Sequence, residues 1–293
     1  MRKQFVSTLE EMLSKDQRII LLLGDIGVFG FKKAFKKFPD RVYNIGILEQ
    51  STIGIASGLA MTELIPVVHT ITPFLVERSY EQLKLDFGYQ KLGGNFVSVG
   101  GSYDYAALGC THHCPGDVGI LKNIPGMEII IPGSAEELDK LFRQTYDNGH
   151  PTYFRLSGRN NFESYEVNFG KANVLKKGKK ATVIIVGSIL SQVLPAVEDS
   201  DVSILYFTTI KPFDAEMLRQ NCDCGKILLC EPYYSGALIA DITNALKPKP
   251  LIIEAVGVPD EFLNKYGKAE EHDEHIGLTV QNIKEKLDNL IKL

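Results

Sequence analysis

The stretch NIGILEQSTIGIASGLA, residues 44–60, places one carboxylate, Glu49, where an apolar strand pattern gives way to a helix of small residues. A strand-to-helix turn ordinarily takes Gly, Ser or Asp. Burying the longer, charged Glu side chain costs free energy unless a partner binds it. We therefore interpret Glu49 as a carboxylate that contacts a bound group. The alternative is a Glu at a helix N-terminus that only the helix dipole stabilises.

Five further polar side chains fall near the ends of predicted strands. Asp25 follows IILLLG, and His69 lies within VVHTIT. His112, His113 and Asp117 lie in the long Gly-rich loop GGSYDYAALGCTHHCPGD, which follows NFVSV. Ligands of open parallel sheets bind at the carboxyl ends of strands, and long loops are often functional. Each of these residues also has an ordinary structural explanation: a turn cap, a core histidine or a bond to a backbone carbonyl.

The cysteines and the glycine-rich stretches argue against several other kinds of site. Five cysteines, an odd number in a chain without a signal-peptide pattern, do not indicate a disulfide framework. Cys110, His112, His113 and Cys114 are alternate positions in one short segment, which rarely converge on one zinc ion. The chain also lacks the phosphate-binding patterns G-x-x-x-x-G-K-S/T and G-x-G-x-x-G and the G-x-S-x-G of hydrolases.

These side chains need a scaffold, and the hydrophobic pattern predicts mostly parallel sheets. Short apolar runs such as RIILLLGD and GNFVSVGG alternate with helical patterns such as FVSTLEEMLSK and FLVERSYEQLKLDF. MEIIIPGSAEELDKLFRQTYD predicts a strand, a turn with Ser134 as N-cap and a helix, and the last predicted helix has Thr279 as its N-cap. We predict an α/β fold of two domains, residues 1–164 and 181–293, joined by a basic linker at 165–180.

Composition and charge narrow the function classes. The chain has 293 residues, of which 44% are hydrophobic and 23% charged, and a net charge of -4. Neither nucleic acid nor an acidic membrane is therefore indicated as a partner. No run of 18 apolar residues predicts a membrane-spanning helix, and the start MRKQFVSTLEEML lacks the apolar core of a signal peptide. We expect a globular cytoplasmic protein.

Several motifs together resemble the C-terminal half of transketolase. FPDRVYNIGILEQSTIGIASGLAM is similar to the pyrimidine-binding domain of thiamine-diphosphate enzymes. GCTHHCPGDVGILKNIPGMEIIIPGSAEEL is similar to the following loop, strand and helix of transketolases and deoxyxylulose-phosphate synthases. VSILYFTTIKPFD and EAVGVPDEFLNKYG are similar to their C-terminal domain. The resemblance covers nearly the whole chain in the right order and implies a pyrimidine-binding domain followed by a transketolase C-terminal-like domain.

The resemblance implies roles for individual residues. In that family the glutamate at the position of Glu49 hydrogen-bonds the aminopyrimidine ring of thiamine diphosphate and favours the tautomer that activates the cofactor. Phe74 resembles the aromatic residue that stacks on this ring, Tyr80 lines the same pocket, and Asp25 lies near the thiazolium. His112 matches a histidine that reaches the substrate oxygen and donates a hydrogen bond or shuttles a proton. For the two aromatic residues, ordinary core packing is the alternative.

The expected substrate contacts depart from the family pattern. Arg155 and Arg159, in YFRLSGRNN, resemble the basic residue that grips a sugar phosphate, with a surface salt bridge as the alternative. Leu108, in LGCTH, stands where the family has an Asp that contacts a sugar hydroxyl. Gly100 aligns near a histidine that touches substrate phosphate. Losing two polar contacts predicts a less hydroxylated or non-phosphorylated acceptor, or an unusual donor.

The chain lacks the G-D-G motif with which the family's N-terminal domain holds Mg²⁺ and the cofactor's diphosphate. The resemblance therefore implies one subunit of a split enzyme, active only with a partner that supplies the diphosphate and metal site. It implies a homodimer of this chain within an α2β2 tetramer, with thiamine diphosphate shared between the chains and no metal held by this one. The reaction would transfer a two-carbon ketol, or a related acyl unit, from a ketose or 2-oxo donor to an aldehyde or ketone acceptor.

Two alternatives stay open. One is the β-type subunit of a 2-oxoacid decarboxylating component or a deoxyxylulose-phosphate-synthase-like enzyme. The T-H-H loop and IKPFD fit the transketolase and synthase side better than the oxoacid one. The other alternative is a regulatory or binding subunit that keeps the fold and does no chemistry. Glu49 and His112 argue against it, whereas Leu108 and Gly100 keep it open.

Overall fold

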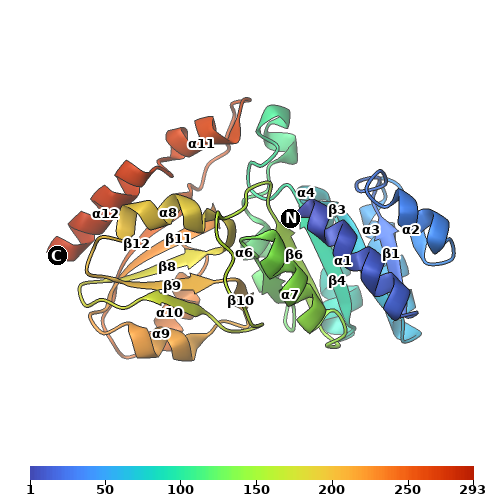
Figure 1. Ribbon diagram of the computed structural model, residues 1–293, viewed down its shortest axis with the longest axis horizontal. Helices are drawn as coiled ribbons and strands as arrows, with labels where there is room; N and C mark the ends of the chain where they lie inside the picture. Colours follow the sequence, from blue (N-terminus) through green and yellow to red (C-terminus); the bar gives the residue numbers. More distant parts are fainter.

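The computed structural model describes residues 1–293 as two α/β units that lie side by side, each with a central sheet flanked by helices (Figure 1). This confirms the predicted α/β fold with two mostly parallel sheets. None of the helices has both the length and the hydrophobicity that crossing a bilayer requires.

The first sheet has seven strands in the order β10-β5-β6-β4-β3-β1-β2. Its strands are β1 (Ile19–Leu23), β2 (Val42–Asn44), β3 (Ile65–Ile71), β4 (Gly94–Val99), β5 (Glu128–Ile130), β6 (Pro151–Leu156) and β10 (Thr209–Lys211). All neighbouring strands are parallel except β10, which pairs antiparallel with β5 so that Thr209 faces Ile130. Because β10 comes from the second half of the chain, the two units share one sheet edge.

The second sheet has five strands in the order β12-β11-β8-β9-β7. Its strands are β7 (Asn173–Lys176), β8 (Thr182–Val186), β9 (Ser203–Phe207), β11 (Lys226–Tyr234) and β12 (Ile252–Val258). Only β7 is antiparallel to its neighbour. β7 lies within the segment 165–180 that the sequence predicts as a linker, so the second sheet already begins inside that segment.

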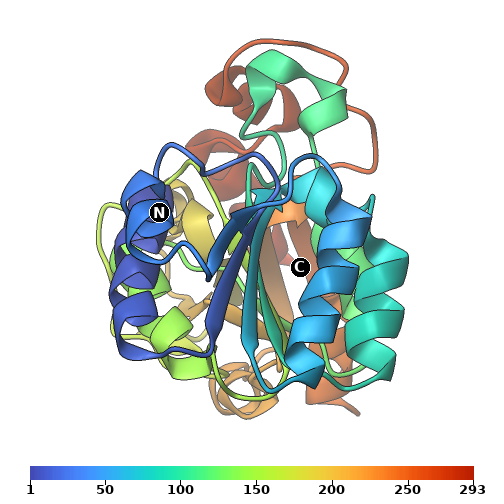
Figure 2. The same ribbon diagram turned by 90° about the vertical axis from the view of Figure 1, so that its right-hand side faces the viewer.

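Helices cover both faces of the first sheet. The helices of this unit are α1 (Arg2–Lys15), α2 (Lys32–Lys37), α3 (Glu49–Met61), α4 (Thr72–Val76), α5 (Tyr80–Gln82), the π-helical η1 (Leu83–Tyr89), α6 (Asp117–Lys122) and α7 (Ala135–Thr145). The short turns η2 (Ala106–Leu108) and η3 (Cys110–His112) lie in the loop that follows β4. Figure 2 shows α1 and α7 on one face of the sheet and α3 beside η1 on the other. Both faces of the strands are therefore buried, as the continuous apolar runs predict.

One predicted helix is broken in the structure. FLVERSYEQLKLDF predicts a single helix, but the segment forms α4, a turn at Arg78 and Ser79, and then α5 and η1. The Ser79 hydroxyl donates to the Leu75 carbonyl at 2.5 Å. Side-chain bonds of this kind compete with the helical ladder and bend the chain. The break places Arg78 at the end of α4, where its side chain is free to reach the edge of the sheet.

The second unit carries the turn η4 (Gly187–Ile189) and the helices α8 (Leu190–Val197), α9 (Ala215–Asn221), α10 (Ile239–Leu246), α11 (Ala269–Ile276) and α12 (Val280–Lys292).

The two N-caps predicted from the sequence are confirmed, one in each unit. The Ser134 side chain accepts from the backbone N–H of Glu137 at 3.2 Å, and the Thr279 side chain accepts from that of Asn282 at 3.3 Å.

The two units also share a hydrophobic core. One cluster of buried side chains runs from Leu22 and Val68 in the first sheet to Ile184 and Leu229 in the second. A common core and a common sheet edge hold the units in one arrangement, and that arrangement positions the loops at the carboxyl ends of the first sheet.

Candidate active site

Glu49 is the first residue of α3 and follows β2 at the carboxyl edge of the first sheet. Its side chain is only 2% exposed. Arg78 donates from Nη1 to Oε2 of Glu49 at 2.6 Å, and the Thr70 hydroxyl lies 3.5 Å from Oε1. The carboxylate that the sequence singles out is therefore buried, and one cation balances its charge.

Phe74 and His112 belong to the same group of side chains, which Arg78 connects. The Arg78 guanidinium lies over the Phe74 ring, 4.3 Å from its centroid. The Phe74 and His112 rings meet edge to face with 5.4 Å between centroids. Three predicted site residues from different segments are thus brought together. Arg78 was not among the residues predicted from the sequence, although Arg78 follows Phe74 by four positions, the spacing of neighbours on one helix face.

Asp25 follows β1 at the same edge of the sheet. Its backbone has a φ of +64°, in the left-handed region that side chains other than Gly, Asn and Asp rarely adopt. Asn44 holds this turn: its Oδ1 accepts from the Asp25 N–H at 2.9 Å, and its amide donates to Asp25 Oδ1 at 3.2 Å. The neighbouring Gly24 carbonyl accepts from the Thr70 hydroxyl at 3.3 Å, the hydroxyl that also approaches Glu49. Asp tolerates this conformation, so the turn is unstrained, and it holds Asp25 at the same edge of the sheet as Glu49.

Tyr80 and His69 have more ordinary surroundings. Tyr80 is half-buried at the start of α5 and packs against the shared core, so its place in a cofactor pocket stays a prediction. His69 is fully buried on β3, and its Nδ1–H donates to the Val97 carbonyl at 2.8 Å. Burial lowers the pKa of His69 to about 4. This residue is therefore a neutral core histidine, the structural explanation that the sequence analysis left open.

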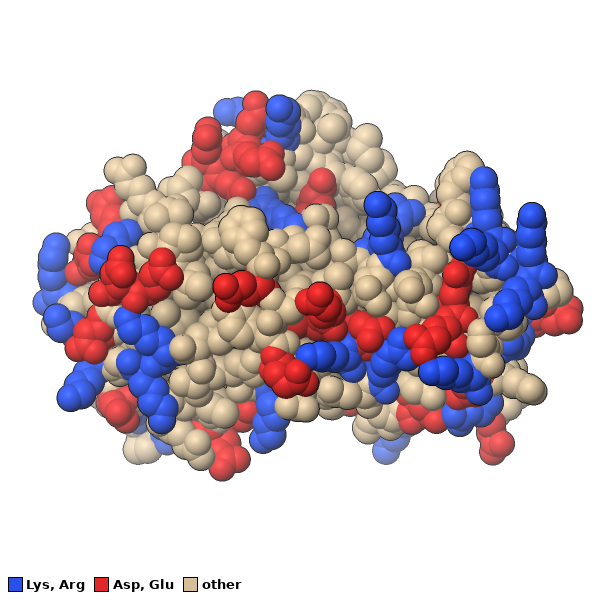
Figure 3. Space-filling view, in the orientation of Figure 1, with Lys and Arg blue, Asp and Glu red and all other residues tan.

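The loop that carries His112 also carries both departures from the family pattern. Leu108 ends η2 with 48% of its surface exposed. Gly100 has a φ of +79°, and a Cβ at this position would lie 2.2 Å from the Tyr105 ring. The Tyr105 ring therefore fills the space that a side chain at position 100 would need, and its centroid lies 6.3 Å from that of His112. Figure 3 shows uncharged surface over the tip of this loop, beside the charged residues of α11.

Arg155 is buried between the two units. Its side chain is 1% exposed, Nε donates to Asp117 Oδ2 at 2.7 Å, and Nη2 donates to the Ser102 hydroxyl at 2.7 Å. The Tyr153 hydroxyl donates to the same carboxylate at 2.7 Å, and burial raises the pKa of Tyr153 well above its usual value. Because its guanidinium is buried and paired, Arg155 is not available to a substrate phosphate. This placement departs from both roles that the sequence analysis considered.

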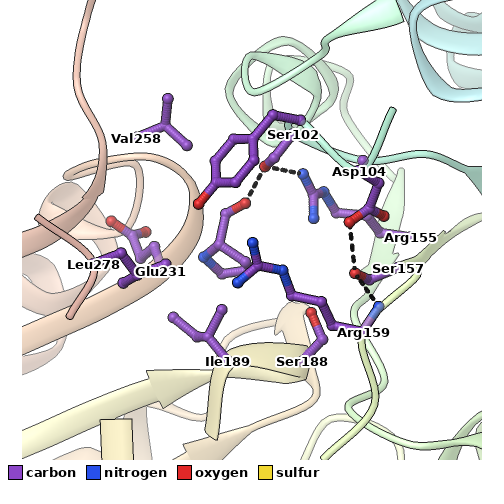
Figure 4. Close-up of a pocket in the computed structure, with 13 residues that line it drawn as sticks. Ser102, Asp104, Arg155, Ser157, Arg159, Ser188, Ile189, Glu231, Val258 and Leu278 are labelled. Carbon is purple, nitrogen blue, oxygen red and sulfur yellow. Dashed lines mark hydrogen bonds between the residues drawn. The ribbon is translucent and has the colours of Figure 1, made fainter. Parts of the chain in front are cut away.

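Arg159 ties the two units together. Nη1 donates to Gln192 Oε1 at 2.7 Å, and Nη2 donates to Asp273 Oδ1 on α11 at 2.8 Å. The Tyr103 hydroxyl donates to the same Asp273 oxygen at 2.5 Å. Arg155 and Arg159 both line a cavity of about 20 Å³ at the contact between the units (Figure 4). That volume holds about one water molecule and excludes a sugar phosphate. The structure thus places both arginines at the domain contact, which does not support their predicted phosphate role.

The cysteines and histidines of the loop do not converge on a common metal site. No group of three or more His, Cys, Asp or Glu side chains is arranged to hold a metal ion. Cys110 is exposed, Cys114 is buried, and both are free thiols. His113 is buried against His272 of α11, with 5.4 Å between ring centroids. His113 and Asp117, which the sequence analysis grouped with His112, therefore anchor the loop, and His112 alone reaches the site of Glu49.

The comparison with known proteins shows which family the chain belongs to. Residues 1–162 match the model described as the transketolase, pyrimidine binding domain. The chain belongs to the transketolase family. It is 31% identical to one of the subunits of the apulose-4-phosphate transketolase of Phocaeicola vulgatus, over 96% of this chain and 94% of that protein. It is 30% identical to 6-deoxy-6-sulfo-D-fructose transketolase subunit SqwH of a Clostridium species, over 97% of this chain and 92% of that protein.

A solved structure supports the same fold. The chain is similar to a split gene transketolase described as an inactive beta4 tetramer, with a TM-score of 0.84 and 24% identity, over 100% of this chain and 98% of that one. The family match and the two relatives confirm the resemblance inferred from the sequence. This transketolase-family chain spans more than nine tenths of two relatives that are themselves named as subunits.

Proposed function

We propose that this chain is the C-terminal subunit of a split transketolase-like enzyme. The enzyme moves a two-carbon ketol, or a related acyl unit, from a ketose or 2-oxo donor to an aldehyde or ketone acceptor. The observation that carries the proposal is Glu49, a carboxylate 2% exposed at the carboxyl edge of the sheet, in one group with Phe74 and His112. Membership of the transketolase family supports thiamine diphosphate as the cofactor.

The residues around Glu49 fit the aminopyrimidine end of thiamine diphosphate. The planar Arg78 guanidinium stacks on Phe74 and donates a hydrogen bond to Glu49. The site therefore has the shape and polarity for a planar ring that donates a hydrogen bond to this carboxylate. Bound thiamine diphosphate would supply the nucleophilic carbon and the electron sink. Glu49 would hold the ring by a hydrogen bond, and Phe74 would stack on it. Asp25 and Tyr80 would line the edges of the pocket.

His112 is the residue proposed to act on the substrate. It is half-buried in η3, its Nδ1 lies 3.0 Å from the Thr111 hydroxyl, and its ring packs against the edge of Phe74. A histidine in this position would donate a hydrogen bond to the substrate oxygen near the reacting carbon or exchange a proton with it.

The diphosphate and Mg²⁺ are assigned to a separate N-terminal subunit. The chain carries no G-D-G motif, and its side chains form no cluster of three potential metal ligands. The relatives named as subunits support the existence of a partner. We propose an α2β2 assembly whose active site forms where Glu49 faces the cofactor that the partner holds.

The substrate is proposed to differ from the usual sugar phosphates. Leu108 presents an apolar side chain on the loop of His112, and Tyr105 fills the space beside Gly100. The two arginines expected to bind phosphate are engaged at the domain contact. The two relatives named for apulose 4-phosphate and for a sulfonated fructose support an atypical ketose. We therefore propose an acceptor or donor with fewer hydroxyl or phosphate contacts to this chain.

Calorimetry of cofactor binding tests the proposal. Thiamine diphosphate with Mg²⁺ is titrated into this chain, into its candidate N-terminal partner with a G-D-G motif, and into the co-expressed pair. We expect binding to the pair and to neither chain alone. Binding in no combination would contradict the split-enzyme proposal and would favour a regulatory subunit of the same fold.

A further inference from the structure

Arg78 makes the same two contacts that the proposed function assigns to the aminopyrimidine ring. Its guanidinium lies 4.3 Å from the centroid of Phe74, and its Nη1 lies 2.6 Å from Oε2 of Glu49. A guanidinium and an aminopyrimidine are both planar, and both carry N–H donors at their edge. We propose, on the basis of the proposed function, that Arg78 is a displaceable occupant of the pyrimidine site and competes with the cofactor for Glu49.

The surroundings of Glu49 leave one direction of approach. Oε1 points toward the Thr70 hydroxyl, which also bonds the Gly24 carbonyl within the fold. Oε2 points toward Arg78, whose side chain is 38% exposed, whereas the Glu49 side chain is 2% exposed. The exposed cation therefore marks the open side of a buried carboxylate. A ligand that reaches Oε2 has to take the position of the guanidinium.

Arg78 is held loosely enough to leave. Its guanidinium makes a single hydrogen-bonded ion pair, from Nη1 to Oε2 of Glu49, and otherwise only stacks on the Phe74 ring. Arg155 offers the contrast within the same chain, because it is 1% exposed and bonded to Asp117 and Ser102. A partly exposed guanidinium that swings out regains its hydration, whereas a buried one does not.

Only a ligand that donates a hydrogen bond to Glu49 can displace Arg78 favourably. Removing the cation alone leaves the buried Glu49 carboxylate with the Thr70 hydroxyl but without a balancing charge, which is strongly unfavourable. A planar donor that replaces the guanidinium restores both the hydrogen bond and the stacking on Phe74. Arg78 therefore protects the carboxylate until such a ligand arrives, and it lowers the apparent affinity by the fraction of molecules in which it fills the site.

Cofactor titration of an Arg78 variant tests this inference. The complex of this chain with its N-terminal partner is titrated with thiamine diphosphate and Mg²⁺ by calorimetry, as wild type and as Arg78→Ala. If Arg78 fills the site in about nine tenths of the molecules, its removal raises the affinity about tenfold. Arg78→Lys keeps the charge but loses the planar group, so we expect an intermediate affinity. Lys36→Ala, which removes an exposed cation that pairs with no carboxylate, should match the wild type.

The outcomes separate the inference from the proposed function. A wild-type complex that binds no cofactor overturns the proposed function, and the inference falls with it. A wild-type complex that binds, with an Arg78→Ala complex that binds equally or more weakly, overturns the inference alone and makes Arg78 a supporting contact. Size-exclusion chromatography verifies assembly of each variant. If Arg78→Ala does not assemble, Arg78→Lys is judged by the same criterion.

Discussion

The chemistry of this subunit depends on a few side chains whose surroundings set their properties. Glu49 is buried and balanced by Arg78, while His112 stands at the tip of a loop with Leu108 beside it. The proposed function implies that Leu108 stands where a carboxylate would otherwise meet a sugar hydroxyl. Leu108 is 48% exposed, so a polar replacement costs the fold little.

Leu108→Asp should improve the use of ordinary ketose phosphates as donors by the assembled enzyme. One new hydrogen bond to a sugar hydroxyl contributes about 1 kcal/mol or slightly more, which corresponds to roughly a tenfold rise in kcat/KM. Steady-state kinetics with a ketose phosphate measures the effect. Leu108→Ala is the matched control, because it removes the leucine without adding an acceptor. Equal kcat/KM for the Asp and Ala variants would show that residue 108 does not face the sugar.

Glu49, Phe74 and His112 were predicted from the sequence as site residues, and the structure brings their side chains together. Their residue types are unusual for a strand end, a helix start or a loop, and this made them visible in the sequence. Arg78 and Tyr105 were not predicted, because their roles arise from contacts between segments that are far apart in the chain. Arg155 could not be interpreted correctly either, since nothing in YFRLSGRNN distinguishes an arginine buried against Asp117 from one that faces solvent.

At the scale of elements, local pattern and caps predicted most helices and strands. Long-range pairing could not be predicted in the same way. β7 lies in a basic, Gly-containing segment with little apolar periodicity, and its strand conformation depends on pairing with β9. β10 has three residues and exists because β5 offers it a free edge. At the break between α4 and α5 the Ser79 hydroxyl bonds the Leu75 carbonyl, and this break places Arg78 over the Phe74 ring.

At the scale of the whole molecule, polar side chains buried at the contact between the units complement the shared core. Arg159 reaches Asp273, and Glu231 of β11 accepts from the backbone N–H groups of Gly236 at 2.6 Å and Leu238 at 3.1 Å. Glu231 lines the same small cavity as the two arginines (Figure 4). Burial raises the pKa of Glu231 from 4.5 to about 7. The stability of the folded chain is therefore expected to depend on pH through this residue.

Glu231 should make the chain less stable as the pH rises from 4.5 to about 7. In that window the folded protein keeps the proton and the unfolded chain loses it, so the stabilisation present at low pH disappears as Glu231 ionises. Glu231→Gln should remove this contribution, which is on the order of 3 kcal/mol. Urea unfolding at pH 5 and pH 8 measures the difference. Glu285→Gln, an exposed carboxylate, should keep the wild-type pH dependence, and the same dependence in Glu231→Gln would contradict the assignment.

The most direct test of the account is the turnover of the assembled enzyme with Glu49→Gln. Glutamine keeps the size of the side chain but cannot act as an acid or a base, so we expect turnover to fall by roughly a hundredfold or more while the subunits still assemble. Glu128→Gln is the matched control, because Glu128 is also buried but accepts from Thr152 and Asn148 at the start of β5. Turnover by Glu49→Gln equal to that of the wild type would contradict the central role of this carboxylate.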